Sequence, residues 1–406
     1  MSRLPAIVAI LLLTFSEVAS AAAPGTPPRY VGSKACQTCH AAIYERWSKT
    51  LMANVVRDPK EHPEAFLCDF SKLPPGLTLR RDDVAFVYGS KWKQRYFTRR
   101  GSNYFVLPVQ WDIVHRTWLK YHPEAGEDWW VADYPSDQMA RPTGPLCDGC
   151  HSVGYNLETQ TVAEWNVGCE RCHGAGSEHV KNPSDYAHNI VNPARLDFVR
   201  ANDVCIQCHS QLRPLANPIH GVYFDWAVGY QPGDRLSDRV SLESHEPGVN
   251  NFFYWPDGSA HKNRMQGNDF VTSVMYSHGV TCFSCHDPHG SGNDALLLKP
   301  GSRMCLECHG ERSPNGPRGS IEEHTHHKAG SPGSDCLACH MPRIAKEIGT
   351  FAVHSHTFRF ISPAVTMKSG VPNPCTSCHT HQTNEWALTQ IRTWENESPW
   401  RLDGRN

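Results

Sequence analysis

Residues 282–286 read Cys-Phe-Ser-Cys-His, and this spacing decides how the whole chain is interpreted. The Cys-x-x-Cys-His pattern occurs eight times, numbered here motifs 1 to 8 in chain order: Cys36/Cys39/His40, Cys147/Cys150/His151, Cys169/Cys172/His173, Cys205/Cys208/His209, Cys282/Cys285/His286, Cys305/Cys308/His309, Cys336/Cys339/His340 and Cys375/Cys378/His379. In such a motif two thiols reach the vinyl groups of one porphyrin and the adjacent imidazole binds its iron. The motifs use all but one of the 17 cysteines. The sequence therefore predicts eight covalently attached haem c groups.

Other uses of paired cysteines fit this pattern poorly. Zinc sites combine one Cys-x-x-Cys pair with a second pair or with spaced histidines, and they do not require His directly after the second cysteine. Thioredoxin-like redox motifs occur singly, and disulfide scaffolds do not repeat one spacing eight times. The cysteine outside the motifs, Cys68, is expected to be a buried or reduced thiol.

The histidine of each motif is the predicted proximal iron ligand, and the other 16 of the 24 histidines can supply distal ligands. The predicted distal ligands lie close to a motif in sequence or in the second of two motif-free stretches: His179, His278, His289, His326, His327, His356 and His261. His354 and His245 are further candidates, and His324 belongs to a weaker group. Two histidine ligands leave the iron no open position, which suits electron transfer.

Motif 1 differs because no histidine follows it closely, and Met52 occupies the place from which a distal ligand would come. A Met52 ligand would raise the reduction potential of that haem. Two alternatives stay open: a core methionine against the porphyrin edge, and an iron with an open position where catalysis would take place.

The first 23 residues are predicted to be a secretory signal peptide. Arg3 precedes an apolar run over residues 6–15, and Ala-x-Ala sequences near residue 21 offer a cleavage site. The run is too short to span a bilayer, so no stable membrane insertion is expected, although an uncleaved anchor is the alternative. The mature protein is expected to be exported, either periplasmic or extracellular.

The composition of the chain bears on two questions: what fills the protein interior, and which classes of partner bind its surface. Only 39% of residues are hydrophobic, so a conventional core would be thin and the haems would supply much of it. The formal net charge of -2 gives no sign of nucleic-acid binding. The expected partners are redox proteins, such as quinol-oxidising or other cytochromes, with self-association as a further expectation.

Uneven motif spacing suggests two lobes with four haems each. Residues 24–215 would form an N-terminal lobe with a β-rich insert at about 80–135, and residues 216–406 a C-terminal lobe with a loop-rich insert at about 217–267. The predicted fold class is that of multihaem cytochromes c: mostly irregular chain with short α-helices around haems, plus the small β-rich insert.

Local patterns place a few elements. Strands are expected within residues 84–88, 95–98 and 104–109, with a hairpin turn at 100–103, and helices at 41–49 and 384–395, the latter capped by Asn384. The sheet is expected to cover a haem face, with a substrate or partner platform as the alternative. Tryptophans in or near it are expected to pack on porphyrins: Trp111, Trp118, Trp129 and Trp130.

Longer stretches resemble the exported multihaem cytochromes grouped with cytochrome c-554. The similar stretches are Tyr30 to Trp47 around motif 1, Val167 to Val180 around motif 3, Gly279 to Gly290 around motif 5 and Cys336 to Pro342 around motif 7. This family shares haem-packing motifs with hydroxylamine oxidoreductase and multihaem nitrite reductases. The resemblance implies parallel and perpendicular haem pairs in a continuous wire, with His179, His278 and His289 as distal ligands. The Cys-x-x-Cys-Lys motif of ammonia-forming nitrite reductases does not occur here.

The predicted function is an electron-conducting cytochrome rather than an enzyme. The first alternative is a multihaem reductase or oxidase of a small nitrogen or sulfur compound, acting at one five-coordinate haem. The second alternative is a polymerising cytochrome that forms a conductive extracellular filament.

Overall fold

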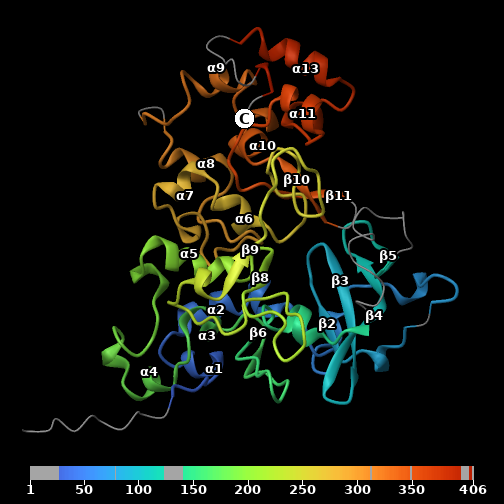
Figure 1. The fold of residues 1–406 in the computed structure, drawn as a ribbon, viewed down its shortest axis with the longest axis vertical. Helices are drawn as coiled ribbons and strands as arrows, with labels where there is room; N and C mark the ends of the chain where they lie inside the picture. Colours follow the sequence, from blue (N-terminus) through green and yellow to red (C-terminus); the bar gives the residue numbers. More distant parts are fainter. Residues whose placement is uncertain are drawn as a thin grey trace, which may run out of the picture.

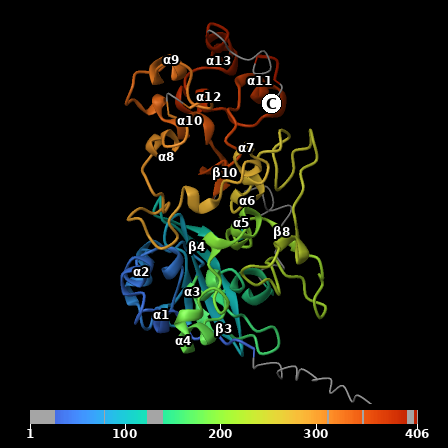
Figure 2. The same cartoon turned by 90° about the vertical axis from the view of Figure 1, so that its left-hand side faces the viewer.

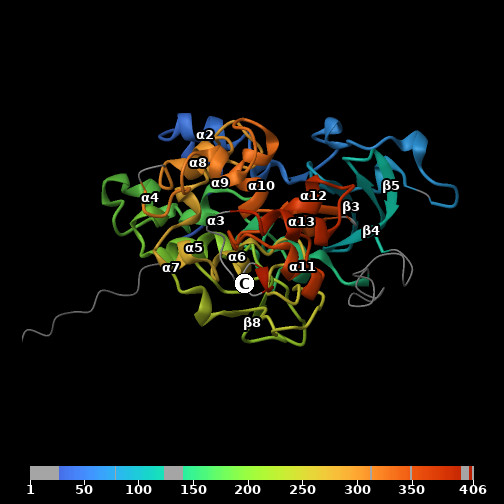
Figure 3. The same cartoon turned by 90° about the horizontal axis from the view of Figure 1, so that it is seen from above.

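A computed structural model describes residues 27–77, 79–122, 140–310, 313–347, 350–394 and 402–404. Short helices and loops dominate it, and one larger sheet stands to the side of the helices that carry most motifs (Figures 1 and 3). The chain runs along the long axis, with its N-terminal half at one end and its C-terminal half at the other (Figures 1 and 2). A boundary between lobes at residues 215 and 216 stays a prediction.

The larger sheet is antiparallel, and its five strands are neighbours in sequence order. They are β1 Val56–Arg57, β2 Phe86–Tyr88, β3 Lys93–Arg100, β4 Asn103–Asp112 and β5 Thr117–Lys120. The three strands expected from sequence are present as β2, β3 and β4. Arg100 pairs with Asn103 across the expected turn, where Gly101 has a positive φ of 62° that glycine adopts without steric cost.

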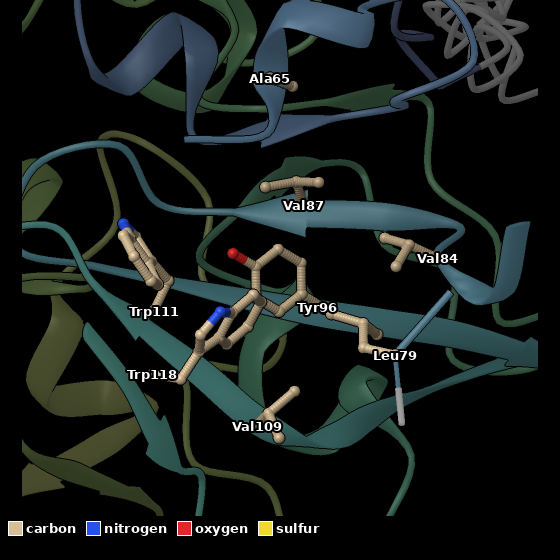
Figure 4. Close-up of a cluster of buried hydrophobic side chains, with 8 residues drawn as sticks. All are labelled: Ala65, Leu79, Val84, Val87, Tyr96, Val109, Trp111 and Trp118. Carbon is tan, nitrogen blue, oxygen red and sulfur yellow. The ribbon is translucent and has the colours of Figure 1, made fainter. Parts of the chain in front are cut away.

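The sheet has its own hydrophobic core (Figure 4). Tyr96, Trp111 and Trp118 meet there, with 0%, 2% and 5% of their surfaces exposed. Because protein atoms already cover Trp111 and Trp118, the expectation that they pack on porphyrins is wrong. Trp129 and Trp130 lie outside the described residues.

The helices are short, and most carry or adjoin a motif. They are α1 Ser33–Cys36, α2 Ala41–Trp47, α3 Cys169–His173, α4 Ser177–Lys181, α5 Phe198–Ile206, α6 Gln266–Phe270, α7 Val274–Ser277, α8 Ser302–Leu306, α9 Ile321–Thr325, α10 Cys336–His340, α11 Pro363–Ser369, α12 Pro374–Cys378 and α13 Asn384–Ile391. The expected cap of α13 is wrong by one residue: the Thr383 side chain accepts the N–H of Trp386, and Asn384 begins the helix.

Three two-stranded ribbons complete the regular structure: β6 Ser152–Val153 with β7 Glu164–Trp165, β8 Leu212–Pro214 with β9 Val240–Leu242, and β10 Arg343–Glu347 with β11 Thr350–His354. Between β9 and α6 the chain has loops without helices or strands. Within the described ranges, every helix falls short of the length and apolarity that a membrane crossing requires.

Candidate haem-binding sites

Each motif occupies about one helical turn. In six motifs the histidine N–H donates to the carbonyl oxygen of the first cysteine at 2.8–3.2 Å, and the remaining two motifs form α3 and α10. Residues four apart in a helix lie on one face. The first thiol and the imidazole of each motif therefore point to the same side, as attachment to one porphyrin requires.

The second cysteine is exposed in three motifs: Cys39 in motif 1, Cys308 in motif 6 and Cys378 in motif 8. The other motif cysteines are half-buried or, at Cys150, buried. Attachment of haem at the three exposed cysteines stays a prediction, with one thioether edge of each haem at the surface.

The imidazoles are oriented by backbone carbonyls. Nδ1 of His173 lies 2.7 Å from the Val191 oxygen, and Nδ1 of His286 lies 2.7 Å from the Ala295 oxygen. His309 has a similar contact of 2.9 Å with Asn315. A hydrogen bond from Nδ1 fixes the tautomer and leaves Nε2 to bind a metal.

Four motif histidines face a second imidazole across a gap that fits one iron. A metal–imidazole bond is about 2 Å long, so two rings on opposite sides of one iron have centroids about 6 Å apart. The observed centroid distances and interplanar angles are 6.4 Å and 17° for His40–His179, 6.1 Å and 7° for His173–His289, 6.2 Å and 9° for His340–His324, and 6.0 Å and 33° for His379–His327. These residues fit axial ligation of haem iron from both sides.

Some of the predicted distal residues face a motif histidine, and others pack against a tryptophan instead. His179, His289 and His327 face motif histidines. His326 instead stacks on Trp394 at 4.3 Å, and His261 packs on Trp255 at 4.1 Å.

The remaining candidates do not form such pairs within the described part of the chain. His278 is exposed, with Nδ1 2.9 Å from the Val274 oxygen. His356 lies near His286 and His209, with Nδ1 3.0 Å from the His354 oxygen. Met52 begins a short 3₁₀ turn and its backbone oxygen accepts the N–H of Val167, whereas His179 is the residue opposite His40.

His324 was undervalued by sequence reasoning. It lies on α9, and His327 follows three residues later, beyond the end of that helix at Thr325. His324 faces motif 7 and His327 faces motif 8. The pattern His-x-x-His was the available signal.

Successive motifs lie close together in space. Sulfur atoms of different motifs are close neighbours at Cys36/Cys169, Cys150/Cys208, Cys205/Cys282 and Cys305/Cys336. Looser neighbours are Cys172/Cys208, Cys285/Cys308 and Cys339/Cys378. The motifs thus form one series, 1–3–4–5–6–7–8, with motif 2 as a branch at motif 4.

Motif 2 has a distinct setting, next to positive charge. Burial, followed by the charges of Arg264 and Arg95, lowers the pKa of His151 to about 4. The Nε atoms of both arginines are buried without a hydrogen-bond partner. Burial and the same Arg264 also hold the pKa of Lys262 well below its usual value. Among the described residues, none presents an imidazole opposite His151.

A cavity of about 740 Å³ adjoins this cluster. Pro145, Arg213 and Asp225 help to line it. Asp225 donates its N–H to the Pro145 oxygen at 2.9 Å and lies near Lys262. Through Pro145 the cavity lies two residues before the first cysteine of motif 2.

Comparisons with known families agree with the motifs. Residues 276–314 match the family described as doubled CXXCH motif, and residues 123–174 match the family described as cytochrome c554 and c-prime. The chain is 24% identical to the dissimilatory sulfite reductase MccA of Wolinella succinogenes over 78% of its own length and 51% of that protein. It is 28% identical to the multiheme cytochrome MtrA of Shewanella baltica over 37% of its own length and 44% of that protein. The matches thus span about half of these relatives.

Solved structures share the fold. The outer cell wall cytochrome OcwA superposes with a TM-score of 0.72 at 23% identity, covering 90% of this chain and 87% of OcwA. An undecaheme cytochrome from the S-layer of Carboxydothermus ferrireducens gives a TM-score of 0.51 at 18% identity, covering 91% and 61% of the two chains. The eight attachment motifs and these similarities support a multihaem c-type cytochrome.

Proposed function

We propose that this chain is an exported octahaem cytochrome that conducts electrons between redox proteins, such as quinol-oxidising or other cytochromes. One observation carries the proposal: the eight motifs form a connected series in which neighbouring sulfur atoms lie close together. A series of this kind allows transfer from site to site without a chemical change in a substrate.

The ends of the series support exchange with partners. Motifs 1 and 8 are the terminal members, and their second cysteines, Cys39 and Cys378, are exposed. A haem attached there would present an edge that a partner protein can approach. Cys308 gives motif 6 the same exposure in the middle of the series.

The protein residues have three tasks in this function. Sixteen motif cysteines attach the haems and the motif histidines ligate iron; the haems supply reversible one-electron chemistry. His179, His289, His324 and His327 close the second axial side at motifs 1, 3, 7 and 8. Nδ1 of His179 lies 3.1 Å from Asn189 Oδ1, and Nδ1 of His327 lies 2.6 Å from the Thr325 oxygen. Such contacts hold a ring in place and strengthen it as a ligand.

The experiment uses the exported chain with its haems. Intact mass should show eight haems, and the protein should take up eight electrons from an electrode to which it is tethered through a C-terminal tag near motif 8. Uptake of all electrons in one fast phase would support conduction along the whole series. A haem-free or zinc-loaded chain, or fast uptake by the haems nearest the tag alone, would contradict it.

Motif 2 favours a second candidate function, the reduction of a small anion. Arg95 and Arg264 lie near His151, and cations in a partly buried site attract oxyanions. One relative is named a sulfite reductase. An iron bound by His151 alone would keep an open position for a ligand.

This candidate is tested by spectroscopy of the oxidised protein. A high-spin ferric signal together with a Soret shift on adding sulfite or nitrite would support it. The signal and the shift should both be lost when Cys147 and Cys150 are replaced by alanine. A fully low-spin protein that is insensitive to both anions would contradict it. Filament formation stays a prediction, tested by electron microscopy at rising protein concentration.

A further inference from the structure

Three pairs of motifs share a hydrogen bond that joins one motif to the next. In each pair, the residue three positions before the first cysteine of one motif accepts the backbone N–H of the first cysteine in the other. Ser33 Oγ accepts from Cys169 at 2.9 Å, Asn202 Oδ1 from Cys282 at 2.8 Å, and Ser302 Oγ from Cys336 at 2.8 Å. The pairs are motifs 1 and 3, 4 and 5, and 6 and 7.

The accepted N–H belongs to the first residue of a short helix each time, in α3, in the 3₁₀ helix Cys282–Ser284 and in α10. Such N–H groups have no partner within their own helix. A side chain from another motif satisfies them here, so each helix start is fixed relative to its neighbour.

The accepting side chains are themselves held by a second hydrogen bond. Ser33 Oγ donates to Glu164 at 2.8 Å, and Ser302 Oγ donates to Asp335 at 2.8 Å. Asn202 donates through Nδ2 to the Val280 oxygen at 3.1 Å. Ser33 and Asn202 are buried, with 1% and 0% of their surfaces exposed. Each accepting side chain is therefore held in place by a second hydrogen bond of its own.

The sulfur contacts have the same pairing. Cys36 lies against Cys169, Cys205 against Cys282 and Cys305 against Cys336. When haems are attached these sulfurs are thioethers, so a thiol hydrogen bond cannot hold them together. The contact from the residue three positions earlier does not involve sulfur and persists in the haem-loaded protein.

We propose that Ser33, Asn202 and Ser302 are positioning residues that set the spacing between the haem attachment points of these three motif pairs, and thereby the electronic coupling within each pair. The inference rests on the proposed function, because it requires haems at these motifs. Electron transfer between neighbouring sites depends on their separation, so such contacts act on each transfer step separately.

The test compares haem-loaded Ser302→Ala, Ser302→Thr and Ser184→Ala with the unaltered protein. Ser302 is half-buried and begins α8, where a methyl group can be added. Thr keeps the accepting hydroxyl. Ser184 is an exposed serine that bonds Asn182 and makes a matched control. The measurements are intact mass, EPR spin coupling between haems, and hydrogen exchange of the peptide that contains Cys336.

In Ser302→Ala we expect full haem loading and altered spin coupling at motifs 6 and 7 alone. Hydrogen exchange at Cys336 should be faster by about 2- to 10-fold, because one hydrogen bond is lost. Ser302→Thr and Ser184→Ala should match the unaltered protein. Full loading with unchanged coupling in Ser302→Ala overturns the inference, and so does an equal change at all haems.

Two further outcomes separate the inference from the proposed function. An unaltered chain without haems refutes the proposed function itself and the inference with it. If Ser302→Ala fails to mature, loading restored by Ser302→Thr supports a need for the hydroxyl, whereas failure of both variants shows a packing requirement and overturns the inference. Ser33→Ala should then change the coupling of motifs 1 and 3 without affecting motifs 6 and 7.

Discussion

Motif 7 and motif 2 carry the same five-residue pattern but differ in what surrounds it. Motif 7 forms the α-helix α10, donates the Cys336 N–H to Ser302 Oγ and faces the second imidazole of His324. Motif 2 begins within a π-helical turn, Gly144–Asp148, and lies beside cationic residues. Gly144 stands three residues before its first cysteine, where no side chain can reach another motif. The pattern thus specifies attachment, while neighbouring residues determine coupling and the second axial ligand.

The largest expected effect is a slower reduction of the haems when a motif within the series, rather than the branch motif, is removed. Replacing Cys205 and Cys208 by alanine removes motif 4, which is adjacent to motifs 2, 3 and 5. From an electrode tethered at the C-terminus, the haems of motifs 5 to 8 should still be reduced fast, while those of motifs 1 to 3 should be reduced much more slowly.

The matched control removes motif 2 through Cys147→Ala and Cys150→Ala. All seven remaining haems should then stay in the fast phase, because a branch is not on the path. Equal slowing in both variants would show that the connected series described above is not the route of the electrons.

The second imidazole that faces motif 7 can be removed by one substitution. Replacing His324 by alanine should remove the imidazole opposite His340 and convert one low-spin haem to a high-spin form in the EPR spectrum. His326→Ala is the control two residues away, because His326 stacks on Trp394. A high-spin signal from His326→Ala, with none from His324→Ala, would reverse the assignment.

These two histidines also show where sequence reasoning succeeded and where it stopped. His326 was preferred to His324, but α9 ends at Thr325 and His326 turns away with a left-handed φ of 54°. His324 and His327, on either side of this helix end, each face a motif histidine. The pair His40–His179 joins residues far apart in sequence, and spacing near motif 1 pointed to Met52 instead.

The tryptophans and the exposed cysteines illustrate a second limit. An apolar strand pattern predicts a buried face but not what covers it, and Trp111 and Trp118 are covered by the sheet's own residues. Likewise, the motif pattern is the same at Cys39 and Cys308 as at the buried Cys150, so it could not show which attachment cysteines are exposed. Exposure depends on tertiary contacts, as do the hydrogen bonds between motifs.

Other features were accessible because their signals are local. The attachment motifs and the three main strands can be read from a few neighbouring residues. The ligand candidates His179, His289 and His327 lie near a motif in sequence, and each faces a motif histidine in the structure.

A smaller effect is expected when motif 2 receives the residue that motif 7 has at the same position. Gly149 corresponds to Ala338 of motif 7. A Cβ atom at Gly149 would lie 1.9 Å from the Trp226 ring, and overpacking of this kind costs about 1–3 kcal/mol. Gly149→Ala should lower the free energy of unfolding by that amount in urea. In a Trp226→Ala background the added methyl has space, so the effect should shrink; an undiminished effect would exclude this clash as the cause.

The smallest effect concerns Asp148, which corresponds to the apolar Leu337 of motif 7. Its carboxyl is buried and bonded by Tyr88 at 2.9 Å and Thr143 at 2.8 Å. Burial raises its pKa from 3.8 to about 6, against the opposing effect of these two hydrogen bonds. A folded-state pKa above the unfolded value means that the protonated acid stabilises the fold at low pH, and that this contribution is lost as the pH rises through about 6.

Between pH 4 and pH 7 the free energy of unfolding should therefore fall by about 2 kcal/mol because of this group. Asp148→Asn cannot ionise, so its unfolding free energy should fall less over the same interval. Urea titrations of both haem-loaded proteins at several pH values measure the difference, in which groups common to both proteins cancel. A variant whose pH dependence equals that of the unaltered protein would show that Asp148 is ionised at no cost in the folded state, and that motif 2 differs from motif 7 in its cationic neighbours rather than in its buried acid.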